Sequence, residues 1–359
     1  MRAGVWDRLE RRESKRTEEL VNILEKPTVA LTLGDPAGIG PELMAKLLAR
    51  REVIGGARAV LVGDPWLWEE GQAIAGVSVP TRTVQGFDQV RAFPDGPPLF
   101  LPVDSARPGD IARSTASVAS GQSVLKVLEM CLDAASEGLI DAICFAPLNK
   151  LSMKMAGMKF QDELHFFADY LKVGSYLGEF NTLGGLWTSR VSSHVPLKDV
   201  ALYVTGERIL DAVKLLYDAL RLAGFVHPRV AVAVLNPHAG EGGSCGREEI
   251  DIIAPAVNEA KARGYPVAGP FPADTIFLKA RDGQYDGIVT MYHDQGQIAV
   301  KLLGFERGVT IHGGLPIPIT TPAHGTAFDI SGQNKASVEA TVQAFLIACR
   351  MGAALRSTG

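Results

Sequence analysis

Three histidines stand where predicted strands end, which is a place where a metal ion could be bound. His194 follows "LWTSRVSS", His238 closes "RVAVAVLNPH", and His293 closes "YDGIVTMYH". In open α/β sheets, ligands bind in the crevice beyond the carboxyl ends of the strands, so imidazoles delivered there could converge on one ion. Three histidines with an open coordination position are typical of a catalytic metal site. Each histidine alone could instead cap its strand or hydrogen-bond a loop, and a Zn, Mg or Mn site would look alike in sequence.

Two charged residues in apolar surroundings could serve the same site. Asp274 lies in the Pro-flanked segment "GPFPADTIF", where a carboxylate either binds a partner such as a cation or forms a turn with its own backbone. Lys301 lies in "IAVKLLGF", where its ammonium group either reaches solvent or serves a site. Asn149 and Lys150 follow the predicted strand "DAICFAPL" and could face the same crevice.

Two glycine-containing segments could carry a cofactor. "LTLGDPAGIGPELMAK" predicts a strand, a turn and a helix, and the turn suits either an anion or a tight structural connection. It lacks the GxGxxG pattern of dinucleotide-binding folds. In "AHGTAFDISGQNKAS", small residues would let a flat ligand approach the backbone, while His324, Asp329 and Asn334 supply donors and acceptors.

The elements that would position these residues alternate between apolar β-branched runs and amphipathic stretches. This pattern is typical of βα units around a mostly parallel sheet. The predicted strands cover residues 28–34, 57–64, 97–104, 141–148, 229–238 and 285–293. The predicted helices cover residues 40–51, 123–138, 206–225, 248–264 and 335–355. Residues 312–326 are predicted to form a long irregular loop, and long ordered loops are often functional.

The composition favours a globular, cytoplasmic protein that acts on small molecules. The 359 residues are 47% hydrophobic, which is enough to bury one large core or two domain-sized ones. A formal charge of -4 offers no basic surface for nucleic acid or for an anionic membrane. Residues 1–26 are dense in charge and lack the apolar core of a signal peptide, so we expect a solvated helix or a frayed extension. No later stretch is long and apolar enough to predict a transmembrane helix.

Five motifs, in this order, carry a resemblance to a known family. "GDPAGIGPE", "NPHAGEGG", "GPFPADTIF", "MYHDQG" and "HGTAFDISGQNKA" resemble the 4-hydroxythreonine-4-phosphate dehydrogenase family of vitamin B6 biosynthesis, over about residues 29–350. The last motif is also similar to the NAD-binding loop of isocitrate and isopropylmalate dehydrogenases, whose two-domain α/β fold that family shares. The resemblance implies NAD or NADP, one divalent metal ion, and a homodimer with its active site in the interdomain cleft at the dimer interface.

The resemblance also assigns regions and residues. We expect a first α/β domain at residues 27–150 plus 265–359, with the cofactor loop, and a second at residues 151–264, with dimerisation surfaces and metal ligands. The implied metal ligands are His194, His238 and His293, the last from the other subunit. The implied cofactor-binding residues are His324, Gly325, Thr326, Ala327, Asp329 and Asn334. For the proton acceptor, Lys301, Asp274 and a metal-bound water stay open, and we favour Lys301 with Asp274 as its partner.

The substrate pocket departs from the family pattern. The family holds a phosphorylated substrate with a His-Thr pair in a "GHTE" motif and then a Lys, an Asn and an Arg. The corresponding residues of this chain are Glu163, Leu164, Lys301, Thr310 and Ile319, and His165 could replace the lost imidazole if the loop shifts. Loss of the Arg removes a bidentate phosphate clamp, and a carboxylate at the His position would repel a dianion.

These departures lead to one main hypothesis and three alternatives. The main hypothesis is an NAD(P)- and metal-dependent dehydrogenase that oxidises and decarboxylates a non-phosphorylated β-hydroxy acid, such as the cis-dihydrodiol carboxylate of terephthalate dihydrodiol dehydrogenase. The first alternative is a true 4-hydroxythreonine-4-phosphate dehydrogenase of pyridoxal phosphate biosynthesis. An inactive, metal-dependent metabolite-binding protein is the alternative of another class. A hydrolase with a metal-activated water is weaker, because it leaves the cofactor loop without a role.

Overall fold

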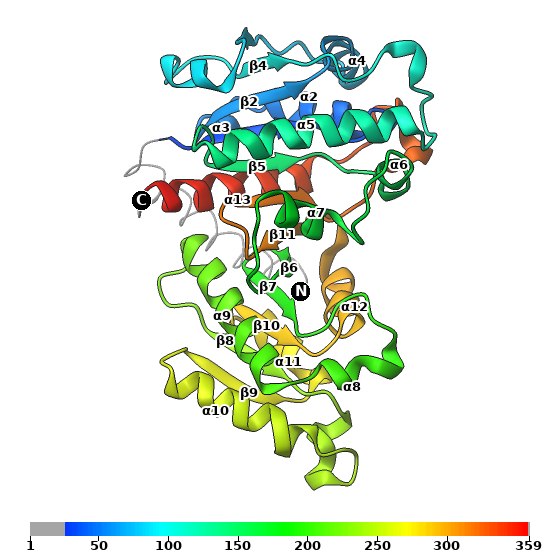
Figure 1. Cartoon of the computed structure of the whole chain (residues 1–359). Helices are drawn as coiled ribbons and strands as arrows, with labels where there is room; N and C mark the ends of the chain where they lie inside the picture. The colour runs from blue at the N-terminus through cyan, green and yellow to red at the C-terminus, as the bar shows by residue number, and fades with distance from the viewer. Residues whose placement is uncertain (1–25, 358–359) are drawn as a thin grey trace. The chain divides into compact units, whose positions relative to one another are not determined.

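The structure is a computed structural model that describes residues 26–357 of the chain (Figure 1). Contacts between Cα atoms group these residues into two compact units. The terminal unit comprises residues 26–175 and 315–357, and the middle unit comprises residues 176–314. Among the described residues, every helix is too short or too polar to cross a lipid bilayer.

The terminal unit is a parallel sheet flanked by helices. Its strands lie in the order β3-β4-β2-β1-β5-β12, and each neighbouring pair is parallel. The strands are β1 (Thr28–Thr32), β2 (Arg58–Gly63), β3 (Arg82–Thr83), β4 (Leu99–Pro102), β5 (Ala142–Phe145) and β12 (Ile319–Pro322). The helices are α2 (Gly40–Leu48), α3 (Arg51–Ile54), α4 (Pro65–Ala75), α5 (Val118–Ser136), α6 (Lys150–Met155), α7 (Glu163–Tyr170) and α13 (Glu339–Arg356). Every residue of β1 is buried, as expected for a central strand against which both α5 and α13 pack.

The middle unit is a mixed sheet with the order β11-β6-β7-β10-β8-β9. β6 pairs antiparallel with β11 and β7, whereas β7, β10, β8 and β9 pair in parallel. The strands are β6 (Gly178–Leu183), β7 (Leu186–Arg190), β8 (Val230–Ala233), β9 (Val267–Phe271), β10 (Gly287–Thr290) and β11 (Val309–Gly313). The helices are α8 (Val200–Tyr203), α9 (Gly206–Leu222), α10 (Ala254–Ala262), α11 (Ala273–Arg281) and α12 (His293–Gly304). Its core includes side chains from β6, β8, α11, β10 and α12, such as Leu183, Ala231, Ile276, Ile288 and Val300.

Polar side chains start several of these helices. Ser117, Asn149, Asp162 and Thr205 each accept a hydrogen bond from a backbone N–H in the first turn of α5, α6, α7 and α9. Such caps satisfy donors that have no partner within the helix. Sequence and local structure therefore agree at these four helix starts.

The mixed α/β class and the mostly parallel sheets are confirmed, and several boundaries differ from the prediction. Residues 151–175 lie in the terminal unit, because α6 and α7 pack against α5. Residues 265–314 lie in the middle unit, because β10 is paired between β7 and β8. The predicted loop 312–326 contains β12, which pairs with β5, so it is not irregular throughout. The extension at residues 1–25 lies outside the described residues.

Candidate functional site

Three parallel strands of the middle unit end on the same edge of the sheet, and a predicted metal ligand follows each of them. β7 and β8 both pair in parallel with β10, so their carboxyl ends lie next to each other. His194 follows β7, His238 follows β8, and His293 begins α12 shortly after β10. The chain thus delivers all three histidines to the sheet edge at which open α/β folds bind ligands.

The register of β7 and β10 brings His194 and His293 together. The pairing continues beyond the strands, because the Ser192 backbone N–H donates to the Met291 carbonyl at 3.1 Å and the Ser192 hydroxyl donates to the same carbonyl at 2.8 Å. Each histidine follows two residues later on its own segment, and the ring centroids are 5.8 Å apart. The resemblance implied that His293 comes from another subunit, but this pair forms within a single chain.

Asp294 determines which nitrogen of His293 can bind a cation. Its Oδ1 lies 2.7 Å from His293 Nδ1. An ionised carboxylate only accepts hydrogen bonds, so Nδ1 carries the proton in this pair and Nε2 keeps its lone pair. Metal-binding histidines commonly have such a carboxylate partner. The side chain of His293 is 38% exposed, so the ring is accessible to a ligand.

The segment that carries His238 has an unusual backbone. Residues 238–242 all have positive φ values, from 45° to 75°, although His238, Ala239 and Glu241 are not glycine. The left-handed conformation costs a non-glycine residue roughly 1–2 kcal/mol. Strain of this kind persists only where the surroundings hold it, and it concentrates at functional sites.

Glu249 holds the chain just before His238. It is buried, and its Oε1 accepts hydrogen bonds from the backbone N–H groups of Leu235 and Asn236 at 2.9 and 2.8 Å. Its Oε2 accepts from Asn236 Nδ2 at 3.0 Å. Burial acts to raise the pKa of Glu249, but the hydrogen bonds from Asn236 and the backbone outweigh burial and leave the pKa below its usual 4.5. This residue was not predicted, because nothing in "REEI" shows that its carboxylate points back at the end of β8.

Gln295 connects the ends of β8 and β10. Its Oε1 accepts a hydrogen bond from the Met291 backbone N–H at 2.7 Å, and its Nε2 donates to the Val234 carbonyl at 2.7 Å. The residues after His293 therefore have separate roles, since Asp294 orients the imidazole and Gln295 fixes two strand ends. The motif "MYHDQG" drew attention to this position, but its amide role was not predicted.

The donors at this edge fit a divalent cation in part. Two imidazoles with a carboxylate partner suit Zn and the other divalent transition metals. Among residues 26–357, no three His, Cys, Asp or Glu side chains are arranged to hold a metal ion, so His238 does not complete the site within one chain. A site with all three histidines therefore requires His238 from a second copy or a movement of its segment.

The two predicted proton-transfer residues both lie on helices of the middle unit. Lys301 is exposed on α12, eight positions after His293, which corresponds to about 12 Å along the helix axis. Asp274 is exposed in the first turn of α11 rather than in a loop. The prediction that its carboxylate lies in apolar surroundings and needs a partner there was therefore wrong. Its neighbours Ile276 and Phe277 face the core, whereas Asp274 does not.

A polar network that the sequence analysis missed adjoins the histidine pair. Arg190 ends β7 and is only 7% exposed; its Nη1 donates to Asn181 Oδ1 at 2.6 Å, and its Nη2 donates to the Glu179 carboxylate. Its Nε donates to Ser193 Oγ at 3.0 Å, immediately before His194 in the chain. Asn181 Nδ2 in turn donates to the hydroxyl of Thr310, the predicted substrate residue of β11, at 3.1 Å. The residues are far apart in sequence, so only strand pairing reveals the network.

Two predicted substrate residues of the terminal unit, Glu163 and His165, each lie beside a charged side chain. Glu163 is buried in the first turn of α7, and its carboxylate lies 3.4 Å from the ammonium group of Lys150 at the start of α6. His165 has a side chain 52% exposed, and its Nδ1 lies 2.6 Å from Asp162, the cap of α7. Lys150 was noted for its position after β5, but its pairing with Glu163 was not predicted.

The other two predicted substrate residues of this unit are apolar and buried. Leu164 is 3% exposed, and Ile319 is fully buried among the core side chains around Phe145 and Leu128. Ile319 thus offers no surface to a substrate, and its predicted role as a direct contact conflicts with this burial. The chain still lacks an arginine at this position of β12.

The predicted cofactor loop packs against the glycine-rich turn that precedes α2. The Ile39 backbone N–H donates to the Thr326 carbonyl at 3.1 Å, and a Cβ atom at Gly38 would lie 3.0 Å from Thr326. Ser331 Oγ donates to the carbonyls of Ala37 and Gly38 at 3.1 and 3.0 Å. The turn therefore supports the loop, and the Ile39 amide is not available to an anion.

The loop itself presents both buried and accessible groups. Thr326 is buried, and His324 and Ala327 are partly buried, whereas the exposed members are Gly325, Asp329 and Asn334. Burial lowers the pKa of His324 below its usual 6.5, so its ring is neutral at neutral pH. An uncharged imidazole beside exposed donors and acceptors is compatible with a ligand that is recognised through hydrogen bonds.

The chain is similar over most of its length to proteins of one family. Residues 56–348 match the family described as "Pyridoxal phosphate biosynthetic protein PdxA". The "Putative 4-hydroxythreonine-4-phosphate dehydrogenase 2" of Pseudomonas aeruginosa is 52% identical over 334 residues, which cover 92% of this chain and 99% of that protein.

Solved structures show the same similarity. The structure of 4-hydroxythreonine-4-phosphate dehydrogenase from Klebsiella pneumoniae has a TM-score of 0.79 and 33% identity, and covers 91% of this chain and 100% of that chain. The structure of a terephthalate 1,2-cis-dihydrodiol dehydrogenase from Burkholderia xenovorans has a TM-score of 0.65 and 28% identity, and covers 90% of this chain and 98% of that chain.

Proposed function

The chain belongs to the PdxA family of pyridoxal phosphate biosynthetic proteins, and from this premise we propose that it oxidises the secondary alcohol of 4-hydroxythreonine-4-phosphate with NAD or NADP. The observation that carries the proposal is the pair of His194 and His293 at the carboxyl ends of β7 and β10. The chain is also similar to a solved structure of such a dehydrogenase over 91% of its length. A hydrolase leaves the cofactor loop unexplained, and so does a binding protein without NAD.

A divalent metal held by His194 and His293 would polarise the alcohol of the substrate. The chain's own residues would then bind and orient the reactants. Residues 323–337 would hold the nicotinamide nucleotide, which supplies the hydride acceptor, and Lys301 would take the hydroxyl proton with Asp274 as its partner. The product ketone lies β to the carboxylate, so we include loss of CO₂ as the second step.

The Glu163–Lys150 ion pair supports a phosphorylated substrate. From the sequence, the carboxylate at position 163 was expected to repel a phosphate dianion and so to disfavour a phosphorylated substrate. In the structure, the Lys150 ammonium group lies 3.4 Å from that carboxylate, so the pair carries no net charge. The repulsion is therefore largely cancelled, and Lys150, whose side chain is 50% exposed, can also offer hydrogen bonds to a phosphate oxygen.

A second candidate substrate is a non-phosphorylated β-hydroxy acid, such as a cis-dihydrodiol carboxylate. Its support is the apolar residue Ile319 at a position where the family pattern has an arginine, together with the similarity to the Burkholderia xenovorans enzyme. Without that guanidinium, the chain lacks one bidentate partner for phosphate.

We further propose that the enzyme works as a homodimer. α12, which carries His293 and Lys301, exposes the apolar side chains Ile298 and Leu302 at 60% and 84%. Leu197 and Leu202, which follow His194, are 73% and 78% exposed. Apolar side chains gathered next to a candidate site are typical of a surface that another chain covers.

Turnover assays test the substrate. The full chain would be assayed for NADH or NADPH formation and for CO₂ release with 4-hydroxythreonine-4-phosphate and with the terephthalate cis-dihydrodiol, each with Mg, Mn or Zn. We expect kcat/KM for the phosphorylated substrate to be higher by about 100-fold, or about 2.7 kcal/mol of transition-state binding. A preference for the dihydrodiol would replace the proposal by the second candidate. NAD binding without turnover of either compound would indicate an inactive binding protein.

A further inference from the structure

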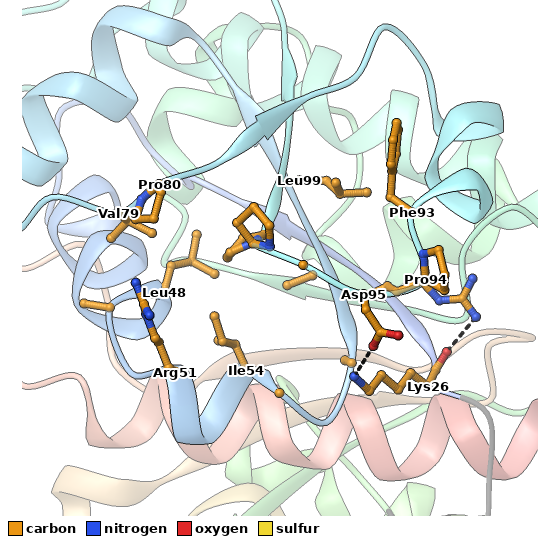
Figure 2. A pocket seen from close by; sticks show the side chains of 18 of the residues that line it. Lys26, Leu48, Arg51, Ile54, Val79, Pro80, Phe93, Pro94, Asp95 and Leu99 are labelled. Atoms are coloured by element: carbon orange, nitrogen blue, oxygen red, sulfur yellow. Dashed lines mark hydrogen bonds and ion pairs between the residues drawn. The ribbon is translucent and has the colours of Figure 1, made fainter.

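A cavity of about 510 Å³ lies in the terminal unit, and none of its lining residues belongs to the candidate site (Figure 2). It is formed by the end of α2, by α3, by the first residues of β2 and β4, and by the connecting segments 78–80 and 93–98. Its size lies within the range of small-molecule sites, which is about 300–1,000 Å³. All of its walls belong to one compact unit.

The cavity opens at the amino ends of parallel strands. Arg58 is the first residue of β2, Leu99 is the first residue of β4, and Lys26 immediately precedes the segment that enters β1. The glycine-rich turn that supports the cofactor loop leaves β1 from its carboxyl end. Because β1, β2 and β4 are parallel, the cavity lies at the opposite edge of the sheet from that turn.

The interior of the cavity is apolar. Leu48, Val79 and Leu99 are at least nine-tenths buried and line it, and Figure 2 shows them with Ile54 and Phe93 around the hollow. The Arg82 guanidinium stacks on Phe93, with its carbon 4.5 Å from the ring centroid. A ligand with an apolar body would bury its surface against these side chains.

The rim of the cavity carries excess positive charge. Lys26, Arg51 and Arg58 line it together with a single carboxylate, Asp95, which pairs with Lys26 at 2.8 Å. Within residues 26–357, Arg58 Nε is buried without a hydrogen-bond partner. In the same part of the chain, the Arg51 guanidinium makes no hydrogen bond or ion pair, and Figure 2 shows it pointing toward Val79.

We propose that this cavity binds an anionic small molecule with an apolar body, such as an aliphatic or aromatic carboxylate. The apolar part would contact Leu48, Val79 and Leu99, and the anionic group would pair with Arg51 and take the donor that Arg58 leaves unused. Lys26 neutralises Asp95, so the one carboxylate at the rim does not oppose an anion. The proposal is independent of the reaction assigned above, because it uses other residues at another edge of the sheet.

The test uses 8-anilinonaphthalene-1-sulfonate, a fluorescent aromatic anion, titrated into the full chain with saturating NAD to keep the dye from the cofactor loop. Arg51→Glu is expected to weaken dye binding by about tenfold or more. Ser78→Trp, which fills the mouth from an exposed position, is expected to remove binding. Arg107→Glu is the matched control, because Arg107 is an exposed arginine of the same unit that follows the carboxyl end of β4.

Displacement of the dye tests the charge requirement. Octanoate is expected to displace it, and octanol, which has the same chain length without the charge, is expected to displace it at least about tenfold less well. Dye binding that is unchanged in both Arg51→Glu and Ser78→Trp would overturn the site. Equal displacement by octanol and octanoate would overturn the preference for an anion.

Discussion

Two histidines of this protein, His293 and His165, each have a carboxylate beside Nδ1 but differ in their other neighbours. His293 has Asp294 at Nδ1, and its ring centroid lies 5.8 Å from that of His194, so the two rings could share a ligand. His165 has the same kind of carboxylate partner, Asp162, but that carboxylate also caps α7 by accepting the His165 backbone N–H at 3.0 Å. Both pairs lie in the first turn of a helix, but the His293 pair also has a second imidazole beside it.

The histidine pair predicts how metal binding responds to substitution. His194→Ala and His293→Ala are each expected to weaken Zn binding by about 100-fold, or about 2.7 kcal/mol, because each removes one of two adjacent nitrogen donors. Titration calorimetry of the purified chain with Zn would measure the change. His227→Ala is the control, since His227 is exposed in the same unit but precedes β8 at its amino end. Unchanged affinity in both site variants would contradict the assignment.

At the scale of elements, the segment between β8 and α10 combines a strained backbone with a buried carboxylate. Residues 238–242 turn through the left-handed region, and Glu249 binds the two amides that precede them. The position of His238 therefore depends on a buried residue that is bonded to the backbone just before it. Such a residue acts on the site only through the backbone that it holds.

Replacing Glu249 should loosen this segment in a pH-dependent way. Glu249→Ala leaves two backbone N–H groups without their acceptor and is expected to lower the free energy of unfolding by about 2–4 kcal/mol at neutral pH. Glu249→Gln keeps one acceptor oxygen and should lose less. Because the folded-state pKa is depressed, the stabilisation is present above the usual pKa of 4.5 and is lost as pH falls through the lower folded value. Urea unfolding at pH 7 and at about pH 3 would measure it, and an equal deficit at both values would refute the role of the charge.

Several elements were predictable from sequence, because local patterns dictate them, whereas β6, β7, β9 and β11 were not among the predicted strands. The strands at Thr28–Thr32, Arg58–Gly63 and Gly287–Thr290 are short apolar runs bounded by glycine and charge, and they appear where periodicity places them. The helix at Gly206–Leu222 has a capping Thr205 and regular apolar spacing. The strand at Ile319–Pro322 was missed, because its prolines and glycines resemble a loop until β5 offers a partner.

The candidate site was predictable in its ligands but not in its supports. Three histidines at strand ends could be found by spacing, whereas Glu249, Gln295 and Arg190 act through contacts between segments that are distant in the chain. Asp274 shows the opposite failure, since apolar neighbours in sequence did not become apolar neighbours in space. The effect of Glu163 on a phosphate could not be judged from sequence either, because only the structure shows that the Lys150 ammonium group lies beside its carboxylate.

At the scale of the whole molecule, we expect a three-histidine site to take His194 and His293 from one chain and His238 from its partner. Mixing His194→Ala and His293→Ala subunits is expected to restore no activity, because both side chains serve the same site from one chain. Mixing His194→Ala with His238→Ala is expected to restore activity, since a heterodimer would then contain one intact site. NADH formation by the remixed dimers would be compared with each variant remixed alone. Recovery in the first mixture would show instead that His293 acts in the partner, as the resemblance implied.

The terminal unit is assembled from both ends of the chain, which has a consequence for how the protein is made. β12 and α13 are synthesised last, yet they pack beside β5 and β1, which leave the ribosome first. Within residues 26–357, the middle unit is one unbroken stretch, so this part can fold while translation continues. The face of β1 and β5 that packs against α13 therefore stays uncovered until the final helix has left the ribosome, and chaperones could recognise it until then.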